Sequence, residues 1–361
     1  MLLFRHIRRY HKLYEKLVKD EVKKCLYRDE TFDVSPTSYI TIYSDIFVKV
    51  HSIDMIRIPK LNKMQAQLFG TNCKKPTANV TVKVEGKDKN KVEIVCKKLD
   101  ENSDWHLEVA VPNMSDVNIS ASGSASVQNL FNSELRVTAN NNIHTRNINS
   151  DLLELISAEG DIDCFGLFVA MKTVVQTGSC GNVFIQKVQG IDVECKTNQG
   201  NILVESSYGL KTKFSTQTGK IDLRNFHKKA QVFIHKTGDL IITAFNGVIN
   251  VTSHGGKIIL DLIQVKEENI INANATEKAI IFISDTVEHT ANIKVTGSFV
   301  TLEPELEHLC KSLNEDKTVF EISTVKNFKN TFIFNAEAAE ISLRKTSWFE
   351  SMRLAFSLAK E

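Results

Sequence analysis

Acidic side chains spaced along a repeated strand pattern are the residues of this sequence that could do chemistry. Carbohydrate-cleaving enzymes built on coiled strands place acids and bases on an outer face, and a glycosidase needs its two carboxyl groups within about 10 Å. The outward position three residues after a recurring glycine carries Asp163 and Asp222. Strands about 4.8 Å apart would separate these two by roughly 14 Å, which is too far. Asp192 with Glu194, and Asp161 with Asp163, could share a local surface, but we interpret them as solvated strand positions.

Ligands for a metal ion or a cofactor do not gather at the spacings that such sites require. His235 and His254 fall near each other in adjacent repeats, but at different offsets from the repeat glycine. The sequence has no glycine-rich nucleotide-binding motif, no serine-hydrolase elbow, no zinc-protease motif and no calcium-binding nonapeptide. We therefore predict no catalytic residue, no metal site and no bound cofactor.

The cysteines indicate structural rather than redox roles. The sequence has no CxxC pair, and an odd count outside a disulfide-dense pattern favours reduced thiols. Cys164 and Cys195 fall at apolar positions of the repeat, where a thiol behaves as a small hydrophobe. The full set is Cys25, Cys73, Cys96, Cys164, Cys180, Cys195 and Cys310.

A glycine that recurs about every nineteen residues organises the middle of the chain. Each copy follows a short polar run and precedes an apolar alternation, as in TNQGNILVE and TQTGKIDLR. A fixed period in this range is typical of repeat architectures. We expect each glycine at a turn with positive φ, which glycine adopts at low cost. The recurring glycines are Gly160, Gly181, Gly200, Gly219, Gly238 and Gly256.

Four columns of mostly apolar residues result when the repeats are aligned on these glycines. Residues two and four positions after the glycine are always apolar, which indicates strands with one internal face. Residues five positions before and seven positions after have one polar exception each. We expect like residues of successive repeats to stack as internal ladders. The two outer columns include Cys195, Phe214, Phe233, Leu167, Phe226, Phe245 and Ile263.

Proline placement points to the same architecture. All five prolines lie outside residues 113–303, and a strand inside a ladder needs the N–H that proline lacks. Weaker copies of the repeat begin near Gly123, Asn141, Lys278 and Gly297. The predicted fold is all-β: a parallel β-solenoid (β-helix) of about nine or ten turns over 113–303, with handedness and number of faces left open.

Composition is that of a soluble chain with an uneven charge distribution. The sequence is 42% apolar and has no run of 18 or more apolar residues, so we expect no integral membrane segment. Residues 1–28 carry a net charge of +6, and the remainder of the chain carries −4. A slightly acidic body gives no case for a nucleic-acid partner.

The basic leader, residues 1–30, resembles a targeting segment. Its apolar residues recur at helical spacing, and no acid precedes Glu15, as in a mitochondrial presequence. No continuous apolar run follows the basic residues, which excludes a secretory signal. A mitochondrial location is the first expectation and a cytoplasmic one the alternative, in which the leader is an ordinary basic or membrane-surface helix.

The regions that flank the repeats are predicted to be β structure with a terminal helix. In 31–112, two alternating runs around EGKDKNK indicate an antiparallel hairpin, and 107–111 a further strand. In 304–361, PELEHLCKSL indicates a short helix, and TVFEISTV and NTFIFNA indicate strands. Ser347 and Glu350 form a capping box before an amphipathic helix, which we expect to cover the open end of the repeats or to dock a partner.

Several of these segments resemble a known family. The run LEVAVP followed by VNISASG, TNQGNILVE, TQTGKIDLR and HKTGDLIIT is similar to the repeat of the "putative adhesin" domain. The resemblance covers about residues 80–300, and the members it resembles most are the animal proteins called "family with sequence similarity 185, member A". It implies a β-solenoid, and it carries no catalytic or binding residue to this sequence.

Two classes of function follow. The first is a non-enzymatic scaffold or binding module that presents a regular face to a protein or glycan partner. The alternative is a carbohydrate-active or other hydrolytic enzyme with a groove beside the repeats. An enzyme needs two or three converging ionisable groups in a cleft, whereas a binding module needs an apolar patch or a patch of one charge.

Overall fold

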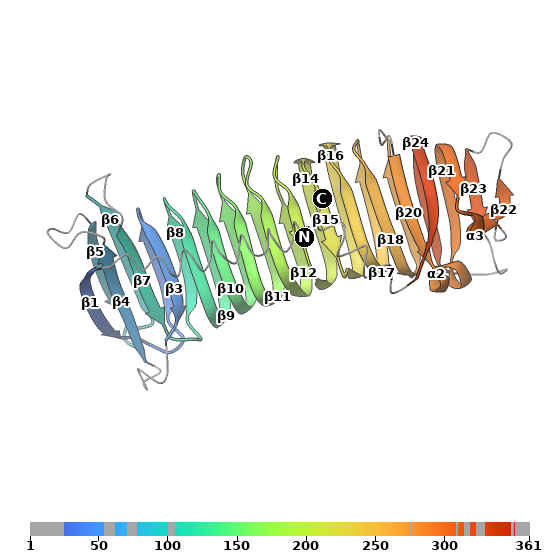
Figure 1. Ribbon diagram of the computed structural model, residues 1–361. Helices are drawn as coiled ribbons and strands as arrows, with labels where there is room; N and C mark the ends of the chain where they lie inside the picture. The colour runs from blue at the N-terminus through green and yellow to red at the C-terminus, as the bar shows by residue number, and fades with distance from the viewer. Residues whose placement is uncertain are drawn as a thin grey trace. The chain divides into compact units, whose positions relative to one another are not determined.

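The fold is all-β, as predicted. The computed structural model describes residues 25–53, 62–70, 78–99, 105–274, 276, 278–307, 310–313, 318–322, 329–347 and 350. Successive strands run side by side through most of this chain (Figure 1). Two short helices, α2 (Asp285–Thr290) and α3 (Pro304–Glu307), complete the described elements. The chain divides into two compact units whose described parts are 25–190 and 191–350.

The N-terminal unit combines antiparallel and parallel pairs. The predicted hairpin is present, because β5 and β6 pair antiparallel around the charged turn with Val82 opposite Ile94. β1 pairs with β4, and β4 with β7, also antiparallel. The strands are β1 (Cys25–Asp33), β2 (Tyr39–Ser44), β3 (Phe47–Ser52), β4 (Lys63–Gly70), β5 (Ala78–Glu85), β6 (Lys91–Lys98), β7 (Trp105–Val111), β8 (Asp116–Ala121), β9 (Ala125–Ala139), β10 (Ile143–Ser157) and β11 (Ile162–Thr177), and β12 (Val183–Lys196) crosses the unit boundary.

Parallel pairing begins earlier in this unit than the sequence predicts. We expected antiparallel structure over 31–112, but β2 pairs in parallel with β6 and β8, and β3 pairs in parallel with β7 and β9. β2 and β3 therefore act as a first turn of the stack. No glycine of the repeat precedes them, so the alignment could not include them.

The C-terminal unit contains two parallel ladders, and the long strands β17 and β24 take part in both. The first half of β17 pairs with β15 and β18, and its second half pairs with β16 and β19. The strands are β13 (Ile202–Val204), β14 (Ser207–Thr218), β15 (Ile221–Arg224), β16 (His227–Thr237), β17 (Leu240–Ser253), β18 (Ile258–Val265), β19 (Glu268–Ala273), β20 (Lys278–Ser284), β21 (Asn292–Leu302), β22 (Cys310–Leu313), β23 (Val319–Ile322) and β24 (Thr331–Thr346).

We name the two ladders of this unit by their strands. The first ladder is β13, β15, the start of β17, β18, β20 and the end of β24. The second ladder is β14, β16, the end of β17, β19 and the start of β24. The pairs of β17, β18, β20, β24 and β19 close into a ring of parallel strands, and their inward apolar side chains form the core.

The last strand is inserted into the stack instead of closing it. β24 pairs with β19 and β20 on one side and with β21 on the other. The weak repeat copy at Gly297 therefore lies next to β24, and not next to the preceding repeat as the sequence order predicts. Residues 310–313 form strand β22, where we expected a helix that continues from Pro304.

The repeat glycines are required by close approach of the backbone. Of the six, Gly256 alone has positive φ (90°), so the predicted turn conformation is wrong for the others. A Cβ on Gly219 would lie 2.2 Å from the carbonyl oxygen of Gly200, and one on Gly238 would lie 2.1 Å from that of Gly219. No side chain fits at such distances. The glycines of each unit thus stack directly on one another.

Polar residues after the repeat glycines form a second ladder of side-chain hydrogen bonds. In the N-terminal unit, Asp161 Oδ1 accepts from the N–H of Asn182 at 2.7 Å. In the C-terminal unit, Asn201 Oδ1 accepts from the N–H of Lys220 at 2.8 Å, and Asp239 Oδ1 from that of Lys257 at 2.8 Å. These contacts satisfy N–H groups at each turn, which explains the Asx residues at this position.

The inner columns predicted from the glycine alignment are confirmed near the glycines and fail farther away. All residues at the second position, such as Ile162 and Ile221, are buried. Phe233 was predicted to be internal but is half-buried, because the ladder partner of Phe214 is Val232. Leu167 is 41% exposed, and its neighbour Phe168 is buried instead. Register shifts inside the paired strands, between Arg146 and Ile148 and between Thr216 and Thr218, cause these slips.

The start of β1 differs from two expectations. Cys25 is disulfide-bonded, with its partner outside the described side chains, whereas the sequence favours reduced thiols throughout. Residues 25–30, which we assigned to the leader, form part of β1 and pair with β4. The amphipathic part of the leader, 1–24, lies outside the described residues.

Candidate functional site

A groove of about 430 Å³ lies beside the bend between the two ladders of the C-terminal unit. β14, β16 and β17 each contribute residues, and Lys266 and Glu267 contribute from the connection between β18 and β19. Its described lining is rich in lysine and contains one aromatic pair. We call it the basic groove.

The strand register places the groove residues in line. His227 pairs with Asn246, and Lys228 pairs with Gly247. A Cβ on Gly247 would lie 2.0 Å from the carbonyl oxygen of Lys228, so only glycine fits there. The N–H of Lys266 donates to the carbonyl of Gly247 at 2.9 Å. Three neighbouring turns therefore form a continuous floor.

A flat ring platform forms one wall of the basic groove. The rings of Tyr208 and His227 are stacked, with centroids 4.9 Å apart and an interplanar angle of 10°. Tyr208 is 36% exposed, and Leu210, two residues along β14, is 45% exposed. Exposed aromatic and aliphatic side chains beside polar groups are typical of binding surfaces.

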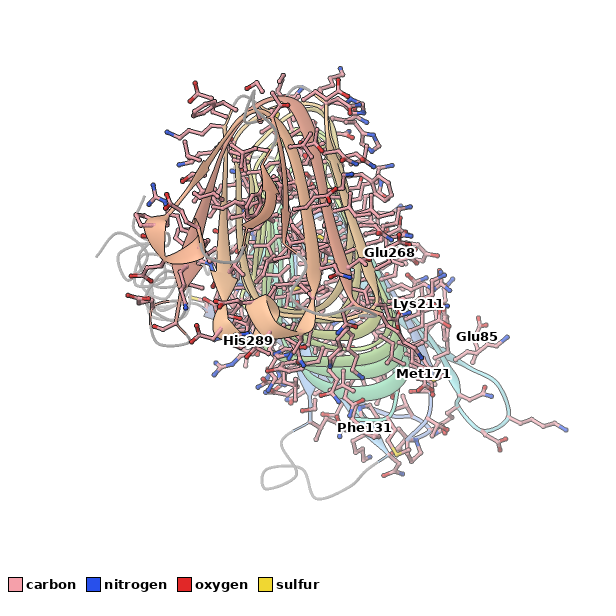
Figure 2. The ribbon with its side chains drawn as sticks, turned by 90° about the vertical axis from the view of Figure 1, so that its right-hand side faces the viewer. Glu85, Phe131, Met171, Lys211, Glu268 and His289 are labelled. Atoms are coloured by element: carbon pink, nitrogen blue, oxygen red, sulfur yellow. The ribbon has the colours of Figure 1, made fainter. Side chains whose placement is uncertain are left out.

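Positive charge dominates the other wall. Lys229 pairs with Glu267 at 2.9 Å, but both side chains are more than half exposed, so the pair contributes little stability. Lys228 and Lys266 have no ion pair among the described residues. Lys211 lies opposite Lys229 in the ladder and points outward (Figure 2). The groove therefore carries unneutralised positive charge, which attracts anions.

Two polar groups in the groove have unusual environments. Burial, together with the charge of Lys266, lowers the pKa of His227, so the ring is neutral at pH 7. The Oδ1 atom of Asn246 is buried and accepts no hydrogen bond within the described structure. A buried acceptor without a donor costs free energy, which makes this amide an unusual neighbour of the groove.

No family model and no curated protein matches this chain. Three solved structures are similar to it. A "putative cell adhesion protein" from Clostridium sporogenes is 7% identical over 88% of this chain and 99% of that one, with a TM-score of 0.18. A "putative adhesin" from Parabacteroides distasonis is 9% identical over 88% and 96%, with a TM-score of 0.36. A "putative adhesin" from Bacteroides fragilis is 12% identical over 71% and 96%, with a TM-score of 0.32. Likeness at these levels assigns no function.

Asp163 belongs to a cluster that sequence spacing did not reveal. Its Oδ2 atom lies 3.1 Å from His144 Nδ1, and Ser126 is the ladder partner of His144 on the other side. This order resembles a serine-hydrolase triad, yet no hydrogen bond joins Ser126 to His144 in the described residues. The nucleophile-to-base contact of such an enzyme is thus missing from this cluster.

Each of the other acidic candidates is bound to a basic side chain or to a backbone N–H group, and not to a second acid. Asp222 accepts two hydrogen bonds from Arg224, at 2.7 and 3.0 Å. Glu194 pairs with Lys213 at 3.2 Å, and Asp161 belongs to the Asx ladder. None of these arrangements brings two carboxyl groups together.

The two histidines that fall near each other in the sequence do not form a metal-binding cluster in the described part of the chain. His235 lies 3.3 Å from Ser215 Oγ, whereas the N–H of His254 donates to a backbone carbonyl. No group of three or more His, Cys, Asp or Glu residues could hold a metal ion there. None of the described helices is long and apolar enough to cross a membrane.

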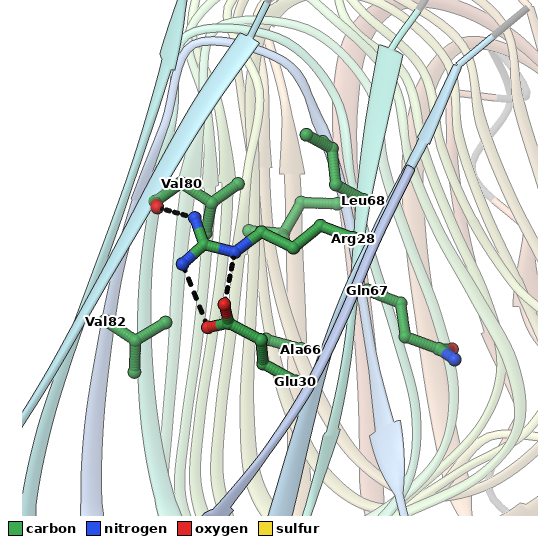
Figure 3. A pocket seen from close by; sticks show the side chains of 8 residues that line it. Arg28, Glu30, Ala66, Gln67, Leu68, Val80 and Val82 are labelled. Carbon is green, nitrogen blue, oxygen red and sulfur yellow. Dashed lines mark hydrogen bonds and ion pairs between the residues drawn. The ribbon is translucent and has the colours of Figure 1, made fainter. Parts of the chain in front are cut away.

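An arginine in the N-terminal unit fills a small pocket between β1, β4 and β5 (Figure 3). The guanidinium of Arg28 binds Glu30 through two hydrogen bonds of 2.8 and 2.9 Å and also donates to the carbonyl of Val80. The space left is too small for a water molecule. This cluster ties β1 to β5, and we assign it a structural role.

A second cluster in the same unit holds one carboxylate strongly ionised. Burial alone would raise the pKa of Glu108, but hydrogen bonds from His51 and Lys49 outweigh it and lower the pKa to about 2. The contacts measure 3.1 Å to His51 and 2.7 Å to Lys49. Lys49 and His51 belong to β3 and Glu108 to β7, so the cluster joins these two strands.

The buried thiols match the prediction of core packing. Burial raises the pKa of Cys164 to about 12, and Thr145 Oγ1 donates to its sulfur at 3.3 Å. Cys195 is fully buried as well. Thiols with raised pKa values carry almost no thiolate at pH 7 and are poor nucleophiles.

Proposed function

We propose that this protein is a non-enzymatic β-solenoid binding module whose basic groove binds an acidic glycan. The observation that carries the proposal is the meeting of a ring platform, unpaired lysines and an unsatisfied amide acceptor in one groove. A sugar ring can lie against Tyr208, and its carboxylate or sulfate can pair with Lys228 and Lys266. Each of these contacts has a matching group on one acidic saccharide.

The repeated parallel pairing supports the solenoid part of the proposal. Within the C-terminal unit, Ile202, Ile221, Leu240 and Ile258 are ladder partners in succession, at the spacing of the glycine repeat. A stack of this kind presents the same bend at each turn, and a linear polymer can follow it. The resemblance of the sequence repeat to the "putative adhesin" domain is in keeping with a binding role.

Titration calorimetry with defined octasaccharides tests the glycan proposal. The probes are a sulfated heparin octasaccharide, a carboxylate-bearing hyaluronan octasaccharide and neutral maltooctaose. We expect at least one acidic probe to bind, with affinity that falls as ionic strength rises, and the neutral probe not to bind. Equal binding of maltooctaose would contradict the role of the lysines.

Charge reversal locates the site. Lys228→Glu with Lys266→Glu should weaken binding about tenfold or more, because two attractive contacts become repulsive. The control pair, Lys236→Glu with Lys278→Glu, changes the net charge equally at exposed positions outside the groove. Equal losses in both variants would show that attraction is nonspecific. An acidic peptide that competes at the groove where glycans fail would identify a protein partner instead.

The enzyme alternative can be tested in the same octasaccharide samples. Chromatography of each octasaccharide after prolonged incubation should recover it intact. Release of shorter products, lost in Ser126→Ala or His144→Gln, would assign hydrolysis to the cluster around Asp163 and would contradict a purely binding role.

We further propose that residues 1–24 direct the protein to mitochondria. The proposal depends on their basic, amphipathic sequence and on the start of β1 at Cys25. A fluorescent protein fused after residue 24 should accumulate in mitochondria, and a version with Arg5, Arg8 and Arg9 changed to Gln should not. Cytoplasmic fluorescence from the first fusion would favour the alternative location.

A further inference from the structure

Lys228 departs from the repeat at a strained position of the basic groove. It lies nine residues after its repeat glycine, where the turns directly before and after hold Gly209 and Gly247. Its φ is 78°, in the left-handed region that glycine adopts at low cost and that a residue with a Cβ adopts only with strain. Strained residues cluster at ligand sites, and the side chain of Lys228 is exposed in the groove.

A second lysine lies across a gap from Lys228. Lys228 is the ladder partner of Gly247, and on the other side of β17 the N–H of Lys266 donates to the carbonyl of Gly247 at 2.9 Å. The strand of Lys228 and the strand that leads to Lys266 are therefore two spacings apart, or about 10 Å. Gly247 has no side chain to fill this gap, and the flexible four-carbon stems of both lysines can lean over it. We call Lys228 and Lys266 the lysine pair.

The ring platform beside the lysine pair is uncharged and partly apolar. The rings of Tyr208 and His227 are stacked 4.9 Å apart, and Leu210, which is 45% exposed, lines the groove with them. Burial and the charge of Lys266 lower the pKa of His227, so this ring is neutral at pH 7. An uncharged sugar ring can stack on such a surface, whereas a charged group would lose hydration against it.

We propose that the basic groove selects a glycan in which uncharged and acidic sugars alternate. The uncharged ring stacks on Tyr208. The acidic group of the neighbouring sugar binds between Lys228 and Lys266. This inference rests on the proposed function, and it adds which sugars the groove takes and where the negative charge lies.

The order of the strands gives the direction of the glycan. Tyr208 belongs to β14, which pairs with β16, and β16 pairs with β17 at Gly247. The ring platform and the gap of the lysine pair therefore follow one another across the strands, within about 10 Å. The glycan crosses the strands and runs along the stack of the C-terminal unit, so successive sugars meet the platform and the lysine pair in turn.

A comparison of two acidic octasaccharides tests the selectivity. In hyaluronan an uncharged sugar alternates with a carboxylate sugar, whereas heparin carries charge on nearly every sugar. At high ionic strength, which screens nonspecific attraction, calorimetry should give an affinity for hyaluronan about fivefold or more above that for heparin. Tighter binding of heparin would overturn the alternating pattern and leave the acidic-glycan proposal standing. Binding of neither probe would contradict both.

Lys228→Gly separates binding from folding. Its affinity for the hyaluronan octasaccharide should fall about fivefold or more, because one of two charged contacts is lost. Its thermal unfolding temperature should be unchanged or higher, because glycine adopts a φ of 78° without strain. The control, Lys236→Gly, removes the same charge from β16 at a position without positive φ. It should unfold at a lower temperature and keep its affinity.

Two results for Lys228→Gly would count against the proposal. An affinity equal to that of the unchanged protein, which still binds hyaluronan, would overturn the role of the lysine pair without touching the proposed function. A fall in unfolding temperature as large as that of Lys236→Gly would show that Lys228 is not strained, and the reason for its retention would be lost.

Lys228→Met and Lys266→Met, alone and combined, test whether the lysine pair binds one group. Methionine keeps most of the stem and removes the charge. If both lysines hold one acidic group, the combined loss of affinity should be smaller than the product of the single losses, because one lysine alone no longer fixes the group. A combined loss equal to that product would show two separate contacts and would overturn the shared site.

Discussion

The two halves of β17 have the same inner face and different outer faces. Ile241, in the first half, points outward and is buried, whereas Asn250, in the second half, points outward and is exposed. The same contrast holds between Ile259 of β18 and Glu268 of β19, which extends into solvent (Figure 2). The first half of β17 thus belongs to a flank that is buried, and its second half belongs to a flank that is open to solvent.

This difference shows what the repeat specifies. Inward positions recur because each turn must bury the same columns against its neighbours. Outward positions are free of that requirement, so one flank acquired apolar residues and a buried ion pair, and the other acquired the lysines of the basic groove. Function is therefore to be expected on the open flank, where side chains can reach a partner.

The largest effect should come from a charge on the covered flank. Ile259→Asp should lower the free energy of unfolding by about 4 kcal/mol, because it removes buried apolar contacts and buries an unpaired carboxylate. Ile270→Asp, at an outward and half-buried position of the second ladder, should cost about 1 kcal/mol. Urea denaturation of both variants measures the difference. Similar losses would remove the distinction between the flanks.

Ion pairs on the two flanks should also differ. Asp222→Asn leaves Arg224 buried beside a neutral amide and should cost about 3 kcal/mol. Glu267→Gln breaks the exposed pair with Lys229 and should cost less than about 0.5 kcal/mol. Thermal unfolding of the two variants at low and high salt provides the comparison. A strong salt dependence of the Asp222 effect would show that its pair is solvated.

The glycine stack should affect both flanks alike. Gly219→Ala places a methyl group against the carbonyl of Gly200 and should cost about 2 kcal/mol. Gly123→Ala is the control, because its new methyl group would meet nothing closer than 3.5 Å. Hydrogen exchange should accelerate in β15 and β16 together for Gly219→Ala. Acceleration in one ladder only would mean that the ladders are not coupled through the turn.

The smallest effect concerns titration in the basic groove. Burial and Lys266 lower the pKa of His227, so Lys266→Gln should raise that pKa toward its ordinary value. Proton NMR titration of the ring measures it, with Lys236→Gln as the control. Because the ring is neutral above its pKa, binding of an acidic probe should strengthen as the pH falls through that pKa. A pH-independent affinity would place the anion away from His227.

The sequence predicted the inner columns near the repeat glycines far better than the outer faces. Ile162, Ile221 and Leu240 are buried as expected, since every turn repeats the same packing requirement. Phe233 and Leu167 were misplaced because one extra residue within a turn reverses the side of every later residue. The insertion of β24 beside β21 could not be predicted, because strand order carries no periodic signal.

The candidate site left only a partial trace in the pattern. Tyr208 and His227 both lie eight residues after their repeat glycines, as Asn246 does, whereas Lys266 lies ten residues after Gly256. Lys229 is an ordinary surface residue in the sequence, and the Asn246 acceptor becomes unusual only when it is buried. The contact between His144 and Asp163 could have been found, because both residues precede an apolar column at equal offsets.

Hydroxyl-radical footprinting of the full-length protein tests the contrast between the flanks most directly. We expect Ile259 to be oxidised several-fold more slowly than Ile270, although both point outward from successive strands of one unit. Rates for Ile241 should match those for Ile259, and Leu210 in the basic groove should react readily. Equal rates for Ile259 and Ile270 would mean that both flanks are open to water and that the first ladder has no covered side.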